Sequence, residues 1–327
     1  MYIRKLGELN RTQFSVIIPL YNKAFYIERA IQSVLAQTIV DYEVIVVDDC
    51  SDDNGAELAS HCLEQSGVSY KIITRSTRGG SCAPARATGI RHACGKFLAF
   101  LDADDEWRDR FLEEVLSMIE RFPQAEAYAV NRELVVDGKI QACGYSENIG
   151  NEVPHVLSLS DYLHARQHYS NPFRVQGMVF IPEALDDIGG FRHAPRSFDI
   201  DLMFRFFLSG KLAAWSPYKG LIIHRVADST VSTTPFQITR PWFYPIQEAI
   251  DRGLVSVDQR KQLYREIWNK RIKDVAAATA RKRLDKRFLQ TIRFCDAPTL
   301  YVLIAILMNV PIAQRSITAN FIRRWIR

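Results

Sequence analysis

The segment Phe97-Leu-Ala-Phe-Leu-Asp-Ala-Asp-Asp-Glu-Trp107 decides the fold, because it joins a buried strand to a cluster of acidic side chains. Its first five residues are all apolar, which is typical of a strand covered on both faces of a sheet. In open α/β sheets, ligands bind at the carboxyl ends of the strands. We therefore expect the acidic residues after Leu101 to lie at a binding edge.

Strand-like and helix-like patterns alternate on the amino-terminal side of this segment. Apolar runs predict strands at Phe14–Leu20, Glu43–Val47 and Tyr70–Thr74, and helical spacing predicts helices at 24–35, 56–64 and 85–93. Such alternation indicates βαβ units and therefore an α/β fold with a mainly parallel central sheet. Beyond it we expect helices at 111–122 and 199–208, a hairpin over 128–143 that turns at Asp137-Gly138, and a strand at 175–181.

The carboxyl-terminal part of the chain has a different pattern. From about residue 239 no strand is predicted, and residues 259–293 read as a long basic helical stretch. We therefore divide the chain into an α/β domain over residues 1–238 and a basic helical region over residues 239–327.

The charge of the chain is unevenly distributed. The net charge is +5, but residues 251–327 hold 17 Lys and Arg against 6 Asp and Glu, a net of +11, whereas residues 1–250 hold 25 against 31, a net of −6. A basic end on an acidic body suggests an anionic partner. Because no nucleic-acid-binding motif is present, we expect peripheral contact with an anionic membrane, the alternative being helices that only pack on the domain.

Cysteines and apolar runs bear on the compartment. The six cysteines are scattered without a C-x-x-C pair, so neither a zinc site nor a disulfide framework is predicted. Residues 1–11 are polar and do not resemble a signal peptide. The longest apolar run, Leu300–Met308, would form a helix of about 14 Å, too short for a hydrocarbon core of about 30 Å. We expect a cytoplasmic protein, peripheral on the inner face of the membrane.

The acidic segment predicts a metal site. Asp102 and Asp104 lie two apart in a turn, so their carboxylates can converge on one hard cation, Mn²⁺ or Mg²⁺, which such sites share with substrate phosphates. The alternative is a solvated acidic loop that caps the next helix.

Further polar residues are expected near the same edge of the sheet. Asp48 and Asp49 end the second strand and could accept hydrogen bonds from a base or a ribose, unless they are the N-cap of the next helix, a role that Ser51 could fill. Arg75 and Arg86 add positive charge that suits a diphosphate, the alternative being a surface salt bridge.

In four segments the sequence resembles glycosyltransferase family 2, the inverting enzymes of GT-A fold. The segments are Ser15-Val-Ile-Ile-Pro-Leu-Tyr-Asn22, Glu43-Val-Ile-Val-Val-Asp-Asp-Cys-Ser51, Ala85-Arg-Ala-Thr-Gly-Ile90 and Phe97–Trp107. Their order and spacing match the family, strongly over residues 13–110 and weakly over 170–235. The resemblance makes residues 1–238 a GT-A catalytic domain.

The resemblance also implies roles for individual residues. Pro19, Tyr21, Asp48 and Asp49 would line the nucleotide pocket. Asp102 would contact ribose or metal, and Asp104 would be the main metal ligand. The segment Phe198-Asp-Ile-Asp-Leu-Met-Phe-Arg205 matches the family's catalytic segment, which makes Asp199 the base and Asp201 and Arg205 its supporting helix residues.

The sequence departs from the family pattern at three positions. Ala87 stands where the family often has Asn, and Phe198 where it often has Glu. Ala227 stands where a histidine near the metal is often found. His224 could replace it, although a lone histidine is more often structural.

The expected function is transfer of a sugar from a nucleotide sugar, with a UDP-sugar as the expected donor, to an acceptor hydroxyl. Bacterial surface polysaccharide or a lipid-linked glycan is the expected acceptor class. A nucleotidyltransferase is the alternative enzyme, but it would need a Gly-rich loop after the first strand, where this chain has Pro19-Leu-Tyr-Asn22. A catalytically inactive sugar- or membrane-binding module is the non-enzymatic alternative.

Overall fold

A computed structural model describes residues 12–141, 153–168, 171–192, 198–225 and 243–267 of the chain. Within these residues, all strands belong to one mixed sheet of ten, in the order β3-β2-β1-β4-β9-β6-β10-β5, with β7 beside β6 and β8 beside β10. The strands are β1 (Phe14–Leu20), β2 (Tyr42–Asp48), β3 (Ser69–Thr74), β4 (Phe97–Phe100), β5 (Glu106–Trp107), β6 (Ala127–Val136), β7 (Lys139–Gln141), β8 (His155–Leu157), β9 (Met178–Phe180) and β10 (Ala213–Arg225).

The amino-terminal half of the sheet is parallel, as the alternation of strands and helices predicts. β1 pairs in parallel with β2 and β4, and β2 with β3, so that Leu20, Asp48 and Thr74 lie at the same level of the sheet. The next residue of each strand, Tyr21, Asp49 or Arg75, therefore emerges at one edge. This edge is where ligands of open α/β sheets bind.

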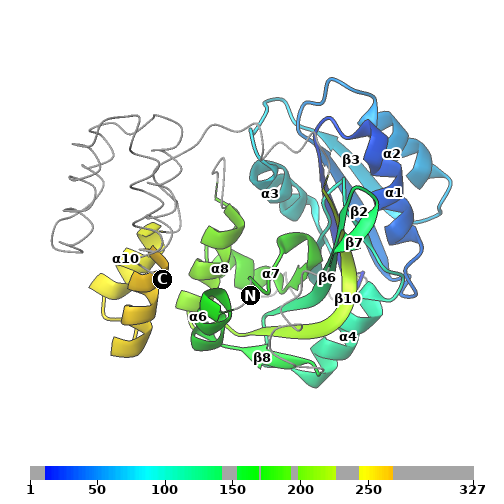
Figure 1. Ribbon diagram of the computed structural model, residues 1–327. Helices are drawn as coiled ribbons and strands as arrows, with labels where there is room; N and C mark the ends of the chain where they lie inside the picture. Colours follow the sequence, from blue (N-terminus) through cyan, green and yellow to red (C-terminus); the bar gives the residue numbers. More distant parts are fainter. Residues whose placement is uncertain (1–11, 142–152, 169–170, 193–197, 226–242, 268–327) are drawn as a thin grey trace, which may run out of the picture.

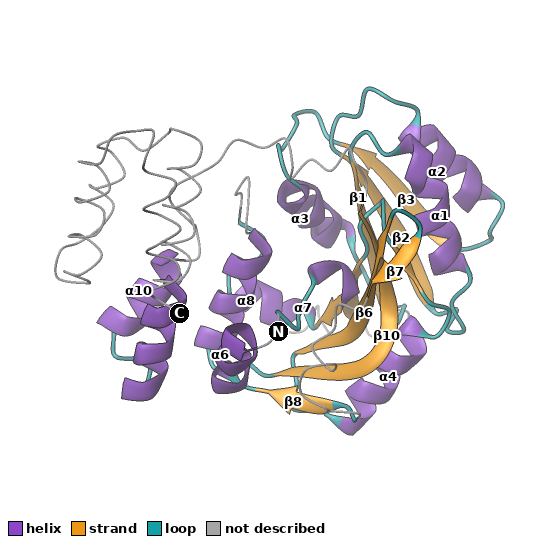
Figure 2. Ribbon diagram, in the orientation of Figure 1, coloured by secondary structure: helices purple, strands orange, loops and turns teal. Residues whose placement is uncertain are grey.

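Helices cover both faces of the sheet (Figures 1 and 2). One layer contains α1 (Ala24–Leu35), α2 (Gly55–Glu64) and α4 (Phe111–Arg121), and the other contains α3 (Cys82–His92), α6 (Leu159–His168), α7 (Pro182–Asp187) and α8 (Phe198–Leu208). Successive side chains of β1 point to opposite faces, so Ile17 packs in the core under α3 while Val16 and Ile18 pack under α1. Because both faces are covered, every residue of β1 and β2 is buried.

The described carboxyl-terminal residues pack on α8. The helix α10 (Phe243–Asp251) precedes a helical segment over residues 257–267, and Ile246, Leu263 and Ile267 belong to the same core as α8. A largely buried ion pair joins the segment to α6, with Arg166 Nη2 3.0 Å from Glu266 Oε2. The division between residues 238 and 239 falls in a stretch outside the described residues and stays a prediction, as do the helix beyond residue 267 and the apolar run Leu300–Met308.

The structure corrects several predicted elements. The strand expected at 175–181 is a short 3-10 turn at Val175–Gly177 followed by β9. The helix expected at 85–93 begins at Cys82 and includes Pro84 in its first turn, where the missing N–H costs no hydrogen bond. The hairpin is confirmed over its described part, since β6 and β7 pair antiparallel around Asp137 and Gly138, which both have positive φ.

No helix within the described residues is both long enough and apolar enough to cross a bilayer.

Candidate active site

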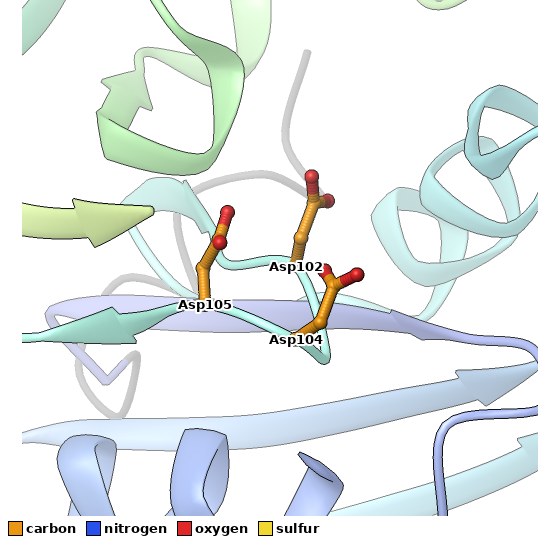
Figure 3. Close-up of side chains that lie close together, drawn as sticks. All are labelled: Asp102, Asp104 and Asp105. Carbon is orange, nitrogen blue, oxygen red and sulfur yellow. The ribbon is translucent and has the colours of Figure 1, made fainter. Parts of the chain in front are cut away.

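Three carboxylates converge in the turn that follows β4 (Figure 3). One carboxylate oxygen from each of Asp102, Asp104 and Asp105 lies within 4.8 Å of the others. The turn is tight because the Asp105 N–H donates to the Asp102 carbonyl at 3.0 Å, and it is anchored because Ala103 is buried. The predicted pair, Asp102 and Asp104, is therefore brought together, and three oxygen donors of this kind suit Mg²⁺ or Mn²⁺.

Asp102 is held by a buried arginine. Arg86 on α3 is 1% exposed and forms an ion pair with the Asp102 carboxylate through Nη2. Its Nε and Nη1 are buried and have no hydrogen-bond partner among the described residues, while the rings of Phe191 and Phe198 lie 5.5 and 5.4 Å from the guanidinium carbon. Burial raises the pKa of Asp102, Arg86 opposes the rise, and Asp104 and Asp199 add to it. The Arg86 pair is thus not the surface salt bridge considered from the sequence.

Asp104 is held from α1. The Lys23 ammonium lies 2.9 Å from Asp104 Oδ2, and Arg29 Nη2 donates to the Asp104 carbonyl at 2.5 Å. The Lys23 side chain is 9% exposed, and that of Asp104 is 22% exposed. Asp104 therefore keeps a route to solvent while its carboxylate contacts a buried cation.

Asp105 is a member of the cluster that the sequence reasoning missed. Its carboxylate accepts a hydrogen bond from the His224 N–H at 3.0 Å and from Gln176 Nε2 at 3.1 Å. Burial raises the pKa of Asp105 well above its usual range, and the charges of Asp102 and Asp104 raise it further. The only signal in the sequence was its place directly after Asp104, which does not distinguish a ligand from a loop residue.

His224 points its ring to a different partner. Its Nε2 lies 2.8 Å from Glu106 Oε1, and the cluster of possible metal ligands found among the described residues contains carboxylates only. His224 therefore supports the site through its main-chain N–H. Ala227 lies outside the described residues.

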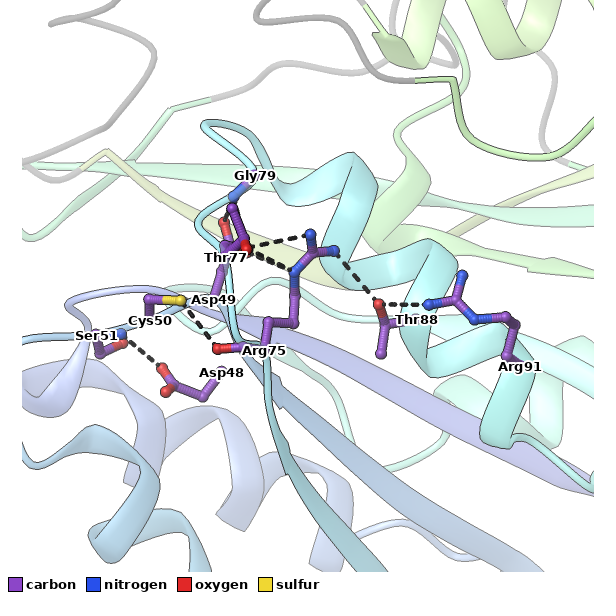
Figure 4. Close-up of polar contacts among 9 residues, drawn as sticks. All are labelled: Asp48, Asp49, Cys50, Ser51, Arg75, Thr77, Gly79, Thr88 and Arg91. Carbon is purple, nitrogen blue, oxygen red and sulfur yellow. Dashed lines mark hydrogen bonds and ion pairs between the residues drawn. The ribbon is translucent and has the colours of Figure 1, made fainter.

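The second pair of aspartates lies at the carboxyl end of β2 (Figure 4). Asp48 Oδ1 accepts from the Ser51 N–H at 3.1 Å. Both oxygens of Asp49 accept from the Gly79 N–H, at 3.0 and 2.8 Å, and Oδ1 lies 2.8 Å from Arg75 Nε. The next helix begins only at Gly55, so neither aspartate is its N-cap.

Burial and the neighbouring positive charges have opposite effects on the pKa of Asp49. Burial raises its pKa, and the Gly79 N–H, Arg75 and Arg78 oppose that rise. Arg75 also donates to Thr88 Oγ1 at 3.3 Å, so its guanidinium fixes the loop after β3 against α3. Arg75 thus lies where it was predicted, but its charge is already paired with Asp49.

Tyr21 and Pro19 lie at the end of β1, on the same edge. Pro19 is buried in the strand, and Tyr21 is partly exposed. The exposed Arg78 places its guanidinium carbon 4.0 Å from the centroid of the Tyr21 ring, a cation–π contact. Arg78 was not predicted, because its approach to Tyr21 depends on the path of the loop after β3.

Asp199 lies in the first turn of α8, which begins at Phe198, so it is not the N-cap of that helix. Its Oδ2 is 3.8 Å from Arg174 Nη1, a loose and partly exposed pair. Its charge contributes to the raised pKa of Asp102 and, after burial, to that of Cys82, which lies at about 12. Asp199 is thus close enough to act electrostatically on both Asp102 and Cys82.

Asp201 and Arg205 have a structural arrangement. They form a buried ion pair of 2.8 Å, and Arg205 also donates to the carbonyls of Ile188 and Gly190. Because this pair fixes the start of α8 to the preceding loop, it orients the turn that carries Asp199.

A parallel half-sheet with acidic residues at the carboxyl ends of β2 and β4 defines an α/β protein of GT-A fold. Residues 15–157 match the family model described as Glycosyl transferase family 2. Residues 15–157, under half of the chain, are therefore similar to glycosyltransferase family 2.

A curated relative and two solved structures illustrate the likeness. The UDP-Glc:alpha-D-GlcNAc-diphosphoundecaprenol beta-1,3-glucosyltransferase WfgD of Escherichia coli is 41% identical over 105 residues, 32% of this chain and 40% of that protein. The chain spans less than half of the length of the first curated relatives that it matches.

The structural matches extend over more of the chain. TarS 1–349 of S. aureus, solved in complex with UDP-GlcNAc, has a TM-score of 0.67 at 15% identity and covers 95% of this chain and 92% of its own. The mannosyltransferase PcManGT of Pyrobaculum calidifontis, in complex with GDP-Man and Mn²⁺, has a TM-score of 0.52 at 18% identity and covers 96% and 85%. At these identities the matches show the fold.

Proposed function

We propose that the chain is an inverting glycosyltransferase that moves a sugar from a nucleotide sugar, with a UDP-sugar as donor, to an acceptor hydroxyl. The observation that carries the proposal is the convergence of Asp102, Asp104 and Asp105 at the edge of the sheet where Asp49 and Tyr21 also emerge. The match of residues 15–157 to the glycosyl transferase family 2 model supports glycosyl transfer over the nucleotidyltransferase considered from the sequence.

The nucleotide would bind across the ends of β1, β2 and β3. Pro19 and Tyr21 would contact the base, and Asp48 and Asp49 would accept hydrogen bonds from the base or the ribose. Arg75, paired with Asp49 at 2.8 Å, would position that carboxylate. TarS, which shares the fold, was solved with UDP-GlcNAc, which supports a UDP-sugar as the donor to test first.

The diphosphate would lie between the end of β4 and α3. Asp104 and Asp102 are the proposed ligands of Mn²⁺ or Mg²⁺, which would stabilise the charge that grows on the leaving diphosphate. Arg86 has two buried N–H-bearing nitrogens without a partner among the described residues, and they can donate to oxygens of the diphosphate or the sugar. An unpaired buried donor costs free energy, so a bound anion there would be favoured.

Asp199 is the proposed base. It would remove the proton from the acceptor hydroxyl, and that oxygen would attack the anomeric carbon on the face opposite the diphosphate. A single displacement inverts the anomeric configuration. The Asp199 side chain is partly exposed and only loosely paired with Arg174, so its carboxylate is free to accept a proton.

The acceptor is proposed to be a lipid-linked glycan of bacterial surface polysaccharide synthesis. The name of the E. coli relative specifies a diphosphoundecaprenol-linked acceptor. The net charge of +11 on residues 251–327 suits peripheral contact with an anionic membrane surface, where a lipid-linked acceptor would be within reach. Residues 1–238 would then be catalytic, and residues 239–327 would hold them at the bilayer.

The test is product formation with matched donors. UDP-, GDP- and dTDP-sugars are each incubated with the protein, Mn²⁺ and a diphosphoundecaprenol-linked sugar, and both the released nucleoside diphosphate and the glycosylated lipid are measured. We expect one donor to support transfer that stops when the metal is chelated. Release of sugar 1-phosphate with transfer of the nucleoside monophosphate instead would indicate a nucleotidyltransferase, and no turnover with any donor would favour an inactive binding module.

A further inference from the structure

Two of the three carboxylates in the cluster are already paired with cationic side chains of the protein. Asp102 is paired with Arg86, and Asp104 is paired with Lys23 at 2.9 Å. Asp105 is hydrogen-bonded by two neutral donors. The two pairs differ in the mobility of the cation. The guanidinium of Arg86 is buried and fixed, and it leaves one oxygen of Asp102 to other partners. The ammonium of Lys23 lies at the end of a flexible four-carbon side chain.

Lys23 is aimed at Asp104 by the start of α1. Its carbonyl accepts from the N–H groups of Tyr26 and Ile27 at 2.9 and 3.0 Å, so the main chain of Lys23 forms the first turn of that helix. The centroid of the Tyr26 ring lies 5.3 Å from the Lys23 ammonium, and the Lys23 side chain is nine-tenths buried. A buried ammonium with this support remains close to Asp104 rather than in solvent.

A divalent cation and this ammonium compete for the same carboxylate. A cation on Asp104 Oδ2 would stand within a few ångströms of Lys23, and like charges at that distance in a partly buried site repel strongly. Lys23 must therefore move away when a metal binds Asp104. An incoming diphosphate offers it a new partner, because phosphate oxygens accept hydrogen bonds from Lys as carboxylates do.

We propose that Lys23 is the resident counter-ion of Asp104, which keeps the affinity of the site for a free divalent cation low until the diphosphate arrives. Lys23 then exchanges Asp104 for a phosphate oxygen, so that metal and diphosphate enter together. This inference rests on the proposed metal site at Asp102 and Asp104, and it adds Lys23 as a positioning residue that couples the two ligands.

The test measures binding of Mn²⁺ alone to the full chain by the loss of the electron paramagnetic resonance signal of free Mn²⁺. Lys23→Met keeps the buried side-chain stem and removes the charge. We expect this variant to bind Mn²⁺ at least tenfold more tightly than the natural protein, whereas Lys23→Arg, which keeps the charge, should not. Lys261→Met removes the same charge from an exposed position on the helical segment over residues 257–267 and should leave Mn²⁺ affinity unchanged.

Added UDP should then distinguish coupling from simple competition. In the natural protein UDP should raise Mn²⁺ affinity by at least tenfold, and in Lys23→Met the rise should be smaller, since the competing charge is already gone. Unchanged or weaker Mn²⁺ binding by a folded Lys23→Met variant, checked by circular dichroism, overturns the inference. So does tight binding by Lys23→Arg. Sugar transfer is measured separately, so its absence would refute the proposed function without deciding the role of Lys23.

Discussion

Replacing Asp199 by Asn separates the proposed base from the rest of the site. Asn keeps the shape of the side chain but cannot accept the proton of the acceptor hydroxyl at neutral pH. General-base catalysis typically contributes about 100- to 10,000-fold to the rate. We therefore expect turnover to fall by about 100-fold or more, which corresponds to a barrier about 2.7 kcal/mol higher.

The structure predicts that the fold tolerates this change. Among the described residues Asp199 forms an ion pair with Arg174 at 3.8 Å, and both side chains are partly exposed. Pairs of this kind contribute about 0–1 kcal/mol, so the free energy of unfolding should fall by less than about 1 kcal/mol. The donor contacts assigned to Asp49, Tyr21 and Arg86 do not involve Asp199, so the affinity for UDP should stay nearly the same.

The assay compares turnover, UDP affinity and the urea unfolding midpoint of Asp199→Asn with those of the natural protein. Asp258→Asn serves as the matched control, because that carboxylate is exposed on the helical segment over residues 257–267 and far along the chain from the site. Near-normal turnover of Asp199→Asn would refute the assignment and move the base to another carboxylate. A loss of UDP affinity as large as the loss of turnover would also refute it, since Asp199 would then bind the donor.

Four other perturbations test separate parts of the description. Asp104→Ala should abolish Mn²⁺- or Mg²⁺-dependent UDP binding with an unchanged circular dichroism spectrum, and unchanged metal dependence would place the ligand elsewhere. Glu43→Gln should reduce stability by about 1–3 kcal/mol at pH 7 and flatten the loss of stability in acid; urea unfolding between pH 3 and 7 measures both. Removing Arg166 or Glu266 alone should cost about 3 kcal/mol, whereas replacing both by apolar residues should cost much less, as a double-mutant cycle would show. The full chain should sediment with anionic vesicles at low salt and not at high salt, and equal binding to neutral vesicles would contradict the electrostatic account.

The sign of the Glu43 effect follows from its surroundings. Burial alone would raise its pKa, but hydrogen bonds from Cys94, Ser15 and Lys71 outweigh burial and lower it. A carboxyl group whose pKa is lower in the folded state stabilises the fold above its unfolded pKa of about 4.3. That stability is lost as the pH falls through the folded value. Gln cannot titrate, so the variant should lack this part of the acid dependence; an equally steep dependence in both proteins would contradict the assignment.

Local pattern was sufficient to predict the parallel half of the sheet. The apolar runs of β1 and β2 are continuous because both faces of those strands are buried, and a run of that kind has few other interpretations. The pair Asp102 and Asp104 was predictable for the same reason, since the strand before it fixes where it emerges.

Long-range partners were not predictable in this way. β10 was missed because Pro217 and Gly220 interrupt its pattern, and its pairing with β6 shifts register on both sides of Lys219. The Asp105 carboxylate is held in place by a hydrogen bond from the main-chain N–H of His224, which is 119 residues away in the sequence. These contacts exist only after the sheet has formed, so no window of the sequence contains both partners.

The burial of Arg86 could not be predicted from the sequence either. A helix of small residues packs so closely on β1 that a Cβ added at Gly89 would lie 2.5 Å from Ile17. That closeness buries Arg86, whose charge had suggested a surface location. The small residues can be seen in the sequence, but how closely the helix packs on the strand depends on the residues of both elements.

The short strand β9 joins the half of the sheet that contains β4 to the half that contains β6, through only a few paired residues. It pairs antiparallel with β4 at Leu98 and Ala99 on one side and with three residues of β6 on the other. Everything proposed to hold the nucleotide lies on the β4 side of this seam, and Asp199 comes from the chain that follows it. A change of acceptor in evolution would therefore have to keep Asp199 and the His224 N–H that holds Asp105, because both lie beyond β9. The other residues beyond β9 can vary with the acceptor while the nucleotide-binding ends of β1, β2 and β3 stay the same.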